Sequence, residues 1–193
     1  MFNDNQPTRL GGFIEMKDEL LMDAPEEVTM VGRGCGRRVA IAAMIAKECL
    51  MRPGTRVLYV GKSKDGVFCE TVKRVAEAVK NTRLKNEGLR GVLKIDFANG
   101  SRITAVRCRS KEDTRRFTGM AAQMVIVEAG FFDGFEEEKR EFVWWQVCSR
   151  ARKIDGVEYG VFYDDGTPLH EGRGTLNEAI ANCCRRRQEA KCE

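Results

Sequence analysis

A glycine-rich turn between an apolar strand and an alanine-rich helix most constrains how this chain can fold. The strand is predicted over Glu27–Val31, the turn reads Gly32-Arg33-Gly34-Cys35-Gly36, and the helix is predicted over Arg37–Met51. A second strand and a second helix follow over Arg56–Val60 and Asp65–Lys80. Strands alternating with helices are typical of an α/β fold with a mainly parallel sheet and helices on both faces. A hydrophobic fraction of 42% over 193 residues is enough for one such core.

The later segments extend this pattern and add an antiparallel hairpin. Asn99-Gly100 is a strong hairpin-turn signal between predicted strands over Leu93–Phe97 and Arg102–Val106. Met124–Val127 is wholly apolar, as expected for a strand covered on both faces. We expect Val28–Val31, Val57–Val60 and Val125–Val127 to be neighbouring central strands. The remaining predicted elements are a helix over Glu137–Ser149, a strand over Val157–Tyr163, and a C-terminal helix opened by a capping box at Thr175–Glu178.

The glycine-rich turn has the form of a phosphate cradle. Backbone N–H groups in such a turn point inward, and the helix N-terminus adds partial positive charge. A complete Walker A motif ends in Gly-Lys-Ser/Thr, whereas Arg37 and Arg38 stand at its lysine and hydroxyl positions here. Arginine can grip phosphate but cannot bind a cation. A strand–helix turn that simply requires small residues is the alternative interpretation. The candidate phosphate-binding residues are Gly32, Arg33, Gly34, Cys35, Gly36, Arg37 and Arg38.

A second motif follows the apolar strand over Met124–Val127. Glu128 comes directly after it, as in a Walker B motif, where the carboxylate normally holds magnesium. Ala129 stands where that motif often has a catalytic glutamate, and alanine cannot act as a base. A solvated glutamate at a strand end is the alternative. Gly61-Lys62-Ser63 matches the last three residues of a Walker A motif, but it directly follows a predicted strand. We therefore place Lys62 at the edge of the sheet where ligands bind in open α/β folds.

Taken in order, these motifs resemble the ATPase domain of large terminases, the motors of viral DNA packaging. The similarity extends over roughly residues 28–168, with the boundary error usual for a single sequence. Four segments carry it: Val31–Arg38 as an arginine-bearing Walker A loop, Asn99–Ile103 as the hairpin stretch, Arg116–Gly119 as the arginine-glycine segment, and Met124–Ala129 as Walker B. The Walker A lysine, its Ser/Thr and the catalytic glutamate of that family are replaced here.

The resemblance implies an N-terminal arm over residues 1–25, a P-loop ATPase-like domain over 26–170 and a C-terminal helix over 171–193, without the family's nuclease domain. It implies ATP and Mg²⁺ as cofactors, with Glu128 as the metal ligand. It also implies double-stranded DNA, viral packaging proteins and further copies of the chain as partners, with Arg115 or Arg116 contacting DNA or a neighbour's nucleotide. Because three parts of the phosphoryl-transfer machinery are replaced, we expect weak or no hydrolysis. The alternative is an inactive scaffold that binds DNA or a viral protein.

Composition and sequence patterns also bear on location, on metal binding and on other classes of protein. No apolar run approaches the ~20 residues of a membrane helix, and the N-terminus lacks a signal-peptide pattern, so we expect a cytoplasmic protein, in the host cytoplasm if viral. The eight cysteines are irregularly spaced, which favours reduced thiols. Zinc on His170 with Cys183, Cys184 and Cys192 is an alternative that lacks closely spaced ligand pairs. Half of a helicase would need a second lobe, and a hydrolase built on His170 lacks a nucleophile motif. The net charge of +4 permits nucleic acid, since the arginines are clustered, but the clusters also suit a solvated surface.

Overall fold

The computed structural model describes residues 36–63, 66–78, 82–85, 91–170 and 174–189. Within them one sheet has the strand order β2-β3-β4-β1-β5-β6. Its strands are β1 (Arg56–Gly61), β2 (Thr82–Lys85), β3 (Val92–Phe97), β4 (Arg102–Arg107), β5 (Met124–Val127) and β6 (Gly160–Tyr163). The helices are α2 (Arg37–Met51), α3 (Val67–Ala78), α4 (Glu137–Cys148) and α5 (Leu176–Glu189), with short 3-10 helices η1 (Glu112–Arg116) and η2 (Phe132–Gly134).

The sheet is parallel on one side and antiparallel on the other. β1 pairs in parallel with β4 and with β5, and β5 pairs in parallel with β6. β3 is antiparallel to β4, as the Asn99-Gly100 turn predicts, and also to β2. The α/β class and the antiparallel hairpin are therefore confirmed. β2 is not among the predicted strands, because Thr82–Lys85 contains one strongly apolar residue and becomes a strand through its pairing with β3.

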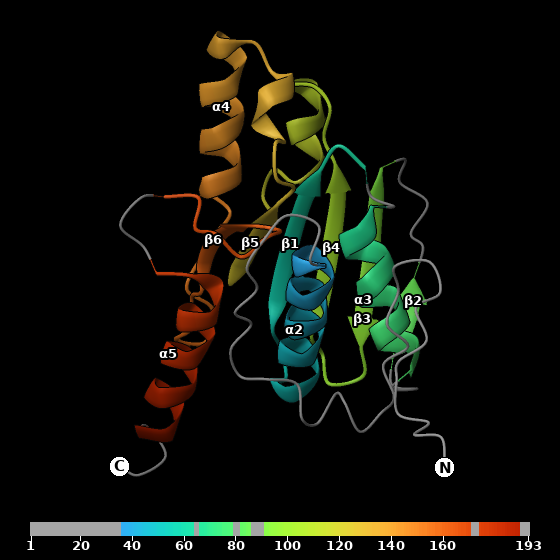
Figure 1. Ribbon diagram of the computed structural model, residues 1–193, viewed down its shortest axis with the longest axis vertical. Helices are drawn as coiled ribbons and strands as arrows, with labels where there is room; N and C mark the ends of the chain where they lie inside the picture. The colour runs from blue at the N-terminus through green and yellow to red at the C-terminus, as the bar shows by residue number, and fades with distance from the viewer. Residues whose placement is uncertain (1–35, 64–65, 79–81, 86–90, 171–173, 190–193) are drawn as a thin grey trace, which may run out of the picture.

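Successive side chains along each strand point to opposite faces of the sheet, so the core consists of two layers. One layer contains Tyr59 and Ile126 and packs against α2, α3 and the first turn of α5. The other contains Val60 and Val127 and packs against α4 and the loops before it. Figure 1 shows α2 and α3 in front of the sheet, and α4 near the end toward which β1 and β4 point. Helices therefore cover both faces, as predicted.

The central strands agree in part with the prediction. β1 and β5 pair with Leu58 opposite Val125 and Val60 opposite Val127, so these two are neighbours. The strand predicted over Val28–Val31 lies outside the described residues. β1 already lies between β4 and β5, and β5 between β1 and β6. Both are therefore central strands of the described sheet, as predicted.

Two elements begin or end as their turn residues require. β6 begins at Gly160, later than the predicted Val157, because Ile154 and Val157 close a tight turn. Its central residues, Asp155 and Gly156, both have positive φ, of 50° and 79°. The predicted capping box at the start of α5 is confirmed: Thr175 N donates to Glu178 Oε2 at 2.7 Å, and Glu178 N donates to Thr175 Oγ1 at 3.4 Å.

Candidate functional site

Two carboxylates follow neighbouring parallel strands at the carboxyl edge of the sheet. The backbone ladder continues one residue past each strand, because Glu128 N donates to Val60 O at 2.9 Å and Asp164 N donates to Val127 O at 2.8 Å. Glu128, predicted from the sequence, is thereby placed beside Asp164, which was not. In open α/β sheets this edge is where ligands bind. The pair is the centre of the candidate site.

Asp164 is held in place by two partners. Its side chain is 2% exposed; Oδ1 accepts a hydrogen bond from Ala129 N at 3.0 Å and lies 3.1 Å from Arg38 Nε. Burial raises the pKa of the Asp164 carboxyl, while the Ala129 N–H and Arg38 partly offset that effect. The negative charge of Glu128 acts in the same direction as burial. Asp164 is thus a desolvated acceptor that a cation stabilises.

The ion pair brings the N-terminus of α2 to the carboxylate edge. Arg38 lies in the first turn of α2, with 47% of its side chain exposed. Gly36, at the helix N-cap, has a φ of 75°, and the first turn contains no acidic residue and no side-chain cap. The first-turn N–H groups and the helix dipole are therefore not balanced by a local acid. Of the predicted phosphate cradle, Gly36, Arg37 and Arg38 are described, whereas Gly32–Cys35 lies outside the described residues.

Lys62 forms the other side of the edge. Its backbone N donates to Glu128 Oε2 at 2.5 Å, and its Nζ donates to Gly130 O at 3.0 Å. Arg109 Nε in turn donates to Lys62 O at 2.9 Å. As predicted, Lys62 follows the end of β1. Its exposed side chain and that of Arg109 add two cations near Glu128.

Gly61 permits the close approach of these groups. A Cβ on Gly61 would lie 2.7 Å from Glu128 Oε2 and 2.9 Å from the Tyr59 hydroxyl, both closer than real Cβ contacts. Tyr59 stacks on Phe68 with ring centroids 4.4 Å apart and is 2% exposed. Burial and the charges of Glu128 and Asp164 raise the pKa of Tyr59, so its hydroxyl keeps its proton.

The predicted arginines after β4 divide into two kinds. Arg116 is used within the chain, because its Nη1 donates to Arg107 O at 2.8 Å and pairs with Asp113 Oδ1 at 2.7 Å. It therefore fixes η1 to the end of β4. Arg115 is exposed on η1. Contacts of either arginine with DNA or a second chain stay predictions.

The oxygen donors of this edge fit Mg²⁺. Mg²⁺ is usually held by one or two carboxylates together with the phosphates of a ligand, and Glu128 and Asp164 supply that number. No cluster of three or more acidic, histidine or cysteine side chains occurs among the residues that the structure describes. His170, the histidine of the zinc alternative, packs edge-on against Trp144 with ring centroids 4.9 Å apart. The side chains of that alternative's cysteines lie outside the description.

No protein-family model and no curated protein matches the chain. Among solved structures, the large terminase of a thermophilic bacteriophage shows 13% identity over 68% of this chain and 31% of its own, with a TM-score of 0.45. The chain thus spans about a third of that enzyme, which has also been solved with ADP. The Thermus phage P74-26 large terminase ATPase domain shows 18% identity over 68% of this chain and 56% of its own, at a TM-score of 0.38. The small COPII coat GTPase SAR1 from Encephalitozoon cuniculi, in complex with GDP, shows 11% identity over 80% and 90%, at 0.33.

These likenesses are weak, and the topology of the chain itself establishes its fold class. In the described part of the chain, no helix is long and apolar enough to cross a membrane. Free thiols are found at Cys49, Cys69, Cys108 and Cys148.

Proposed function

We propose that the chain binds ATP with Mg²⁺ at the Glu128–Asp164 edge and hydrolyses it weakly or not at all, as a terminase-like domain in viral DNA packaging. The observation that carries the proposal is the Arg38–Asp164 ion pair. It places a helix N-terminus, suited to phosphate, beside two carboxylates suited to a divalent cation. Lys62 and Arg109 add positive charge on the other side of Glu128.

Weak hydrolysis follows from the residues that surround the carboxylates. Ala129 contributes its backbone N–H to Asp164 and has no side-chain base. Asp164 is engaged by Ala129 and Arg38, and Glu128 Oε2 accepts the Lys62 N–H. General-base catalysis contributes about 10²–10⁴ in rate, and no carboxylate here is free of partners to supply it. We therefore expect turnover far below the ordinary ~1 s⁻¹.

The test is a titration with a fluorescent ATP analogue, with Mg²⁺ or with EDTA, on the native chain, Glu128→Gln and Asp164→Asn. We expect Mg²⁺ to strengthen binding of the native protein by about tenfold or more, and each variant to lose most of that gain. Glu138→Gln, which removes the same charge from an exposed position on α4, is the matched control. Equal affinity with Mg²⁺ and EDTA, or a full Mg²⁺ effect in Glu128→Gln, would contradict the proposal.

The second candidate is an inactive scaffold that binds DNA or a packaging protein. The same ion pair favours it, because Arg38 already neutralises the carboxylate that a metal would use. In that case the arginines of the α2 N-terminus contact DNA phosphates, and binding weakens steeply with salt. Fluorescence anisotropy with labelled duplex DNA on the native chain and on Arg37→Ala/Arg38→Ala distinguishes the two candidates when set beside the nucleotide titration.

A further inference from the structure

The first half of α4 projects into solvent. Every residue from Glu137 to Phe142 is exposed, and this stretch is longer than one helical turn, so no side of it is covered. Val143 and Val147, in the second half of the helix, are buried in the α4 layer of the core. Figure 1 shows α4 extending past the ends toward which β1 and β4 point. The helix is thus attached through its second half, and its first half offers a surface to other molecules.

Two large aromatic side chains lie on the side of α4 that faces away from the core. At about 100° per residue, Trp145 and Glu138 share one direction, opposite the two buried valines, with Glu141 and Phe142 on either side of it. Trp145 is 57% exposed and Phe142 is 37% exposed. We call the surface formed by Glu138, Glu141, Phe142 and Trp145 the outer face of α4. It combines exposed aromatic rings with carboxylates, and exposed apolar surface of this kind marks interaction sites.

The basic residues of α4 lie away from its outer face. They are Lys139 and Arg140, and both contact residues that precede the helix. Lys139 Nζ pairs with Glu136 Oε2 at 2.6 Å, and Arg140 Nη2 donates to Phe135 O at 3.4 Å. The helix therefore contributes negative charge alone to its outer face, although the whole chain has a net charge of +4.

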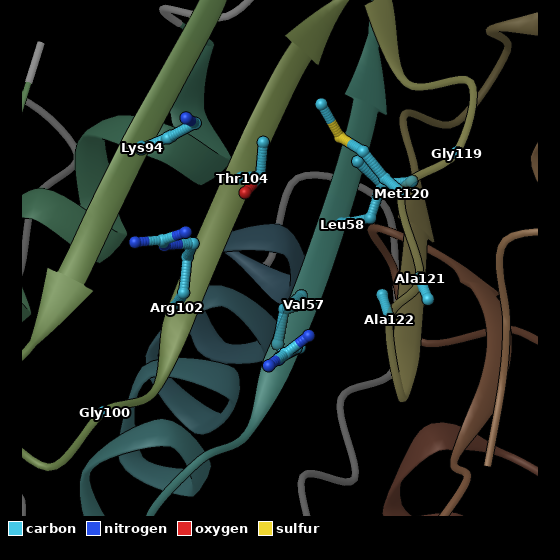
Figure 2. A pocket seen from close by; sticks show the side chains of 11 residues that line it. Val57, Leu58, Lys94, Gly100, Arg102, Thr104, Gly119, Met120, Ala121 and Ala122 are labelled. Carbon is cyan, nitrogen blue, oxygen red and sulfur yellow. The ribbon is translucent and has the colours of Figure 1, made fainter. Parts of the chain in front are cut away.

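Basic side chains of the sheet gather in a different place. Figure 2 shows Lys94 and Arg102 on neighbouring strands, beside a hollow of about 470 Å³ over the start of β1 and β4. Arg102 forms an ion pair there with Asp96. Positive charge on the sheet and negative charge on the outer face of α4 are thus separated, and the two surfaces suit partners of opposite charge.

A cation from elsewhere in the chain already contacts this face. Lys111, at the N-cap of η1, places its Nζ 4.4 Å from the centroid of the Phe142 ring. The face of an aromatic ring attracts cations, and tryptophan attracts them more strongly than phenylalanine does. Trp145 is the more exposed of the two rings and lies one helical turn from Glu141. A guanidinium group can stack on the ring and pair with the carboxylate at the same time, a combination that the compact ammonium group of lysine matches less well.

We propose that the outer face of α4 docks an arginine-bearing segment of a partner protein, with one guanidinium group stacked on Trp145 and paired with Glu141. Tryptophan and arginine are the residues that most often dominate binding at protein interfaces. The carboxylates oppose the approach of nucleic acid, and α4 of a second copy would bring like charges together. The residues of this face are distinct from those of the Glu128–Asp164 edge, so the proposal does not depend on nucleotide binding.

The experiment measures the fluorescence anisotropy of two labelled dodecapeptides, one alternating arginine with alanine and the other lysine with alanine, at about 0.15 M salt. We expect the arginine peptide to bind more tightly than the lysine peptide. Trp145→Ala should weaken its binding by about fivefold through loss of the cation–π contact, and Glu141→Gln by about threefold through loss of the ion pair. Glu137→Gln, the same charge change on the flank of α4, and Met51→Ala, the loss of another exposed apolar side chain, should leave binding unchanged.

Several outcomes would overturn the proposal. They are absence of arginine-peptide binding, native-like binding by Trp145→Ala, equal binding of the lysine peptide, and an equal loss in Glu137→Gln and Glu141→Gln. A labelled single strand of twelve nucleotides that binds the native chain but not Trp145→Ala would make this face a nucleic-acid surface instead. A native dimer in sedimentation that Trp145→Ala dissociates would make it a contact between copies. Circular dichroism checks that Trp145→Ala is folded, and Glu141→Gln, at an exposed position, tests the same contact independently.

Discussion

Asp164 is a buried carboxylate whose stability effect depends on pH. Because burial raises its pKa above the ordinary value of 3.8, the folded protein binds this proton more tightly than the unfolded chain does. The contribution of Asp164 to stability is therefore lost as pH rises from about 3.8 through the folded pKa. Asp164→Asn removes this titration. We expect the free energy of unfolding of the variant, relative to that of the native chain, to increase as pH rises above about 3.8.

Urea unfolding at several pH values measures that difference. Asp165→Asn is the matched control, since Asp165 caps the following turn by accepting from Thr167 N at 3.0 Å and is less buried. A difference between Asp164→Asn and the native chain that does not change with pH, or that moves against the variant as pH rises, would show that the pKa of Asp164 is not raised.

Gly61 has no room for a side chain at the candidate site. Its alanine variant would force a methyl group against Glu128 Oε2 and the Tyr59 hydroxyl. We expect Gly61→Ala to lower the free energy of unfolding by about 1–3 kcal/mol, the usual cost of overpacking a buried region. The Mg²⁺ effect on nucleotide binding should fall with it. Gly66→Ala is the comparison, because the nearest atoms to a Cβ at Gly66 are 3.9 Å away. Similar losses in the two variants would refute a specific contact at Gly61.

The residues of the site were predictable where they followed an unambiguous strand. Glu128 and Lys62 come directly after apolar runs, so the sequence places both at the carboxyl edge. Asp164 follows a run that ends in Asp164-Asp165-Gly166, where aspartates suit a turn as well as a ligand site. Its role depends on the neighbouring strand β5 and on Arg38, and neither contact is encoded locally.

At the scale of elements, hydrogen bonds from Asn99 attach the C-terminal end of α2 to the β3–β4 turn. Asn99 Nδ2 donates to Cys49 O at 2.8 Å and to Leu50 O at 2.9 Å, while its Oδ1 accepts from Ser101 N at 3.1 Å. Asn99→Asp keeps the turn bond but sets an acceptor against two carbonyl groups. We expect it to destabilise the protein by about 1–3 kcal/mol. Asn99→Ala, which loses the bonds without repulsion, should be the milder change. An aspartate variant more stable than the alanine variant in urea would contradict this arrangement.

At the same scale, long periodic elements were predicted and pairing-dependent ones were not. α2 has its predicted bounds, because its alanines favour a helix and Pro53-Gly54 ends it. β5 also has its predicted bounds, because its four consecutive apolar residues indicate a buried strand. β2 needs β3 beside it to exist. β6 is shorter than the predicted Val157–Tyr163 because Val157 closes the Asp155-Gly156 turn, and this dipeptide is a strong turn signal.

For the whole molecule, the two core layers share the strands of one sheet, so we expect them to unfold together. Both tryptophans, Trp144 and Trp145, are on α4, and Trp144 packs against the core layer on that face. On the opposite face, α2 and α3 contribute strongly to far-ultraviolet circular dichroism. Ile45 is fully buried in the α2 layer. Ile45→Val should therefore lower the stability seen by both probes equally, by about 0.5–1.5 kcal/mol.

We expect the two layers to unfold together because β1 and β5 contribute side chains to both of them. Side chains of these strands alternate between the layers, so a strand cannot leave one layer and keep its packing in the other. The measurement is a pair of urea transitions, by tryptophan fluorescence and by circular dichroism, on the native chain and on Ile45→Val. Val143→Ala, which opens the α4 layer instead, is the reciprocal variant. If Ile45→Val shifts the circular dichroism midpoint and leaves the fluorescence midpoint in place, the layers unfold independently.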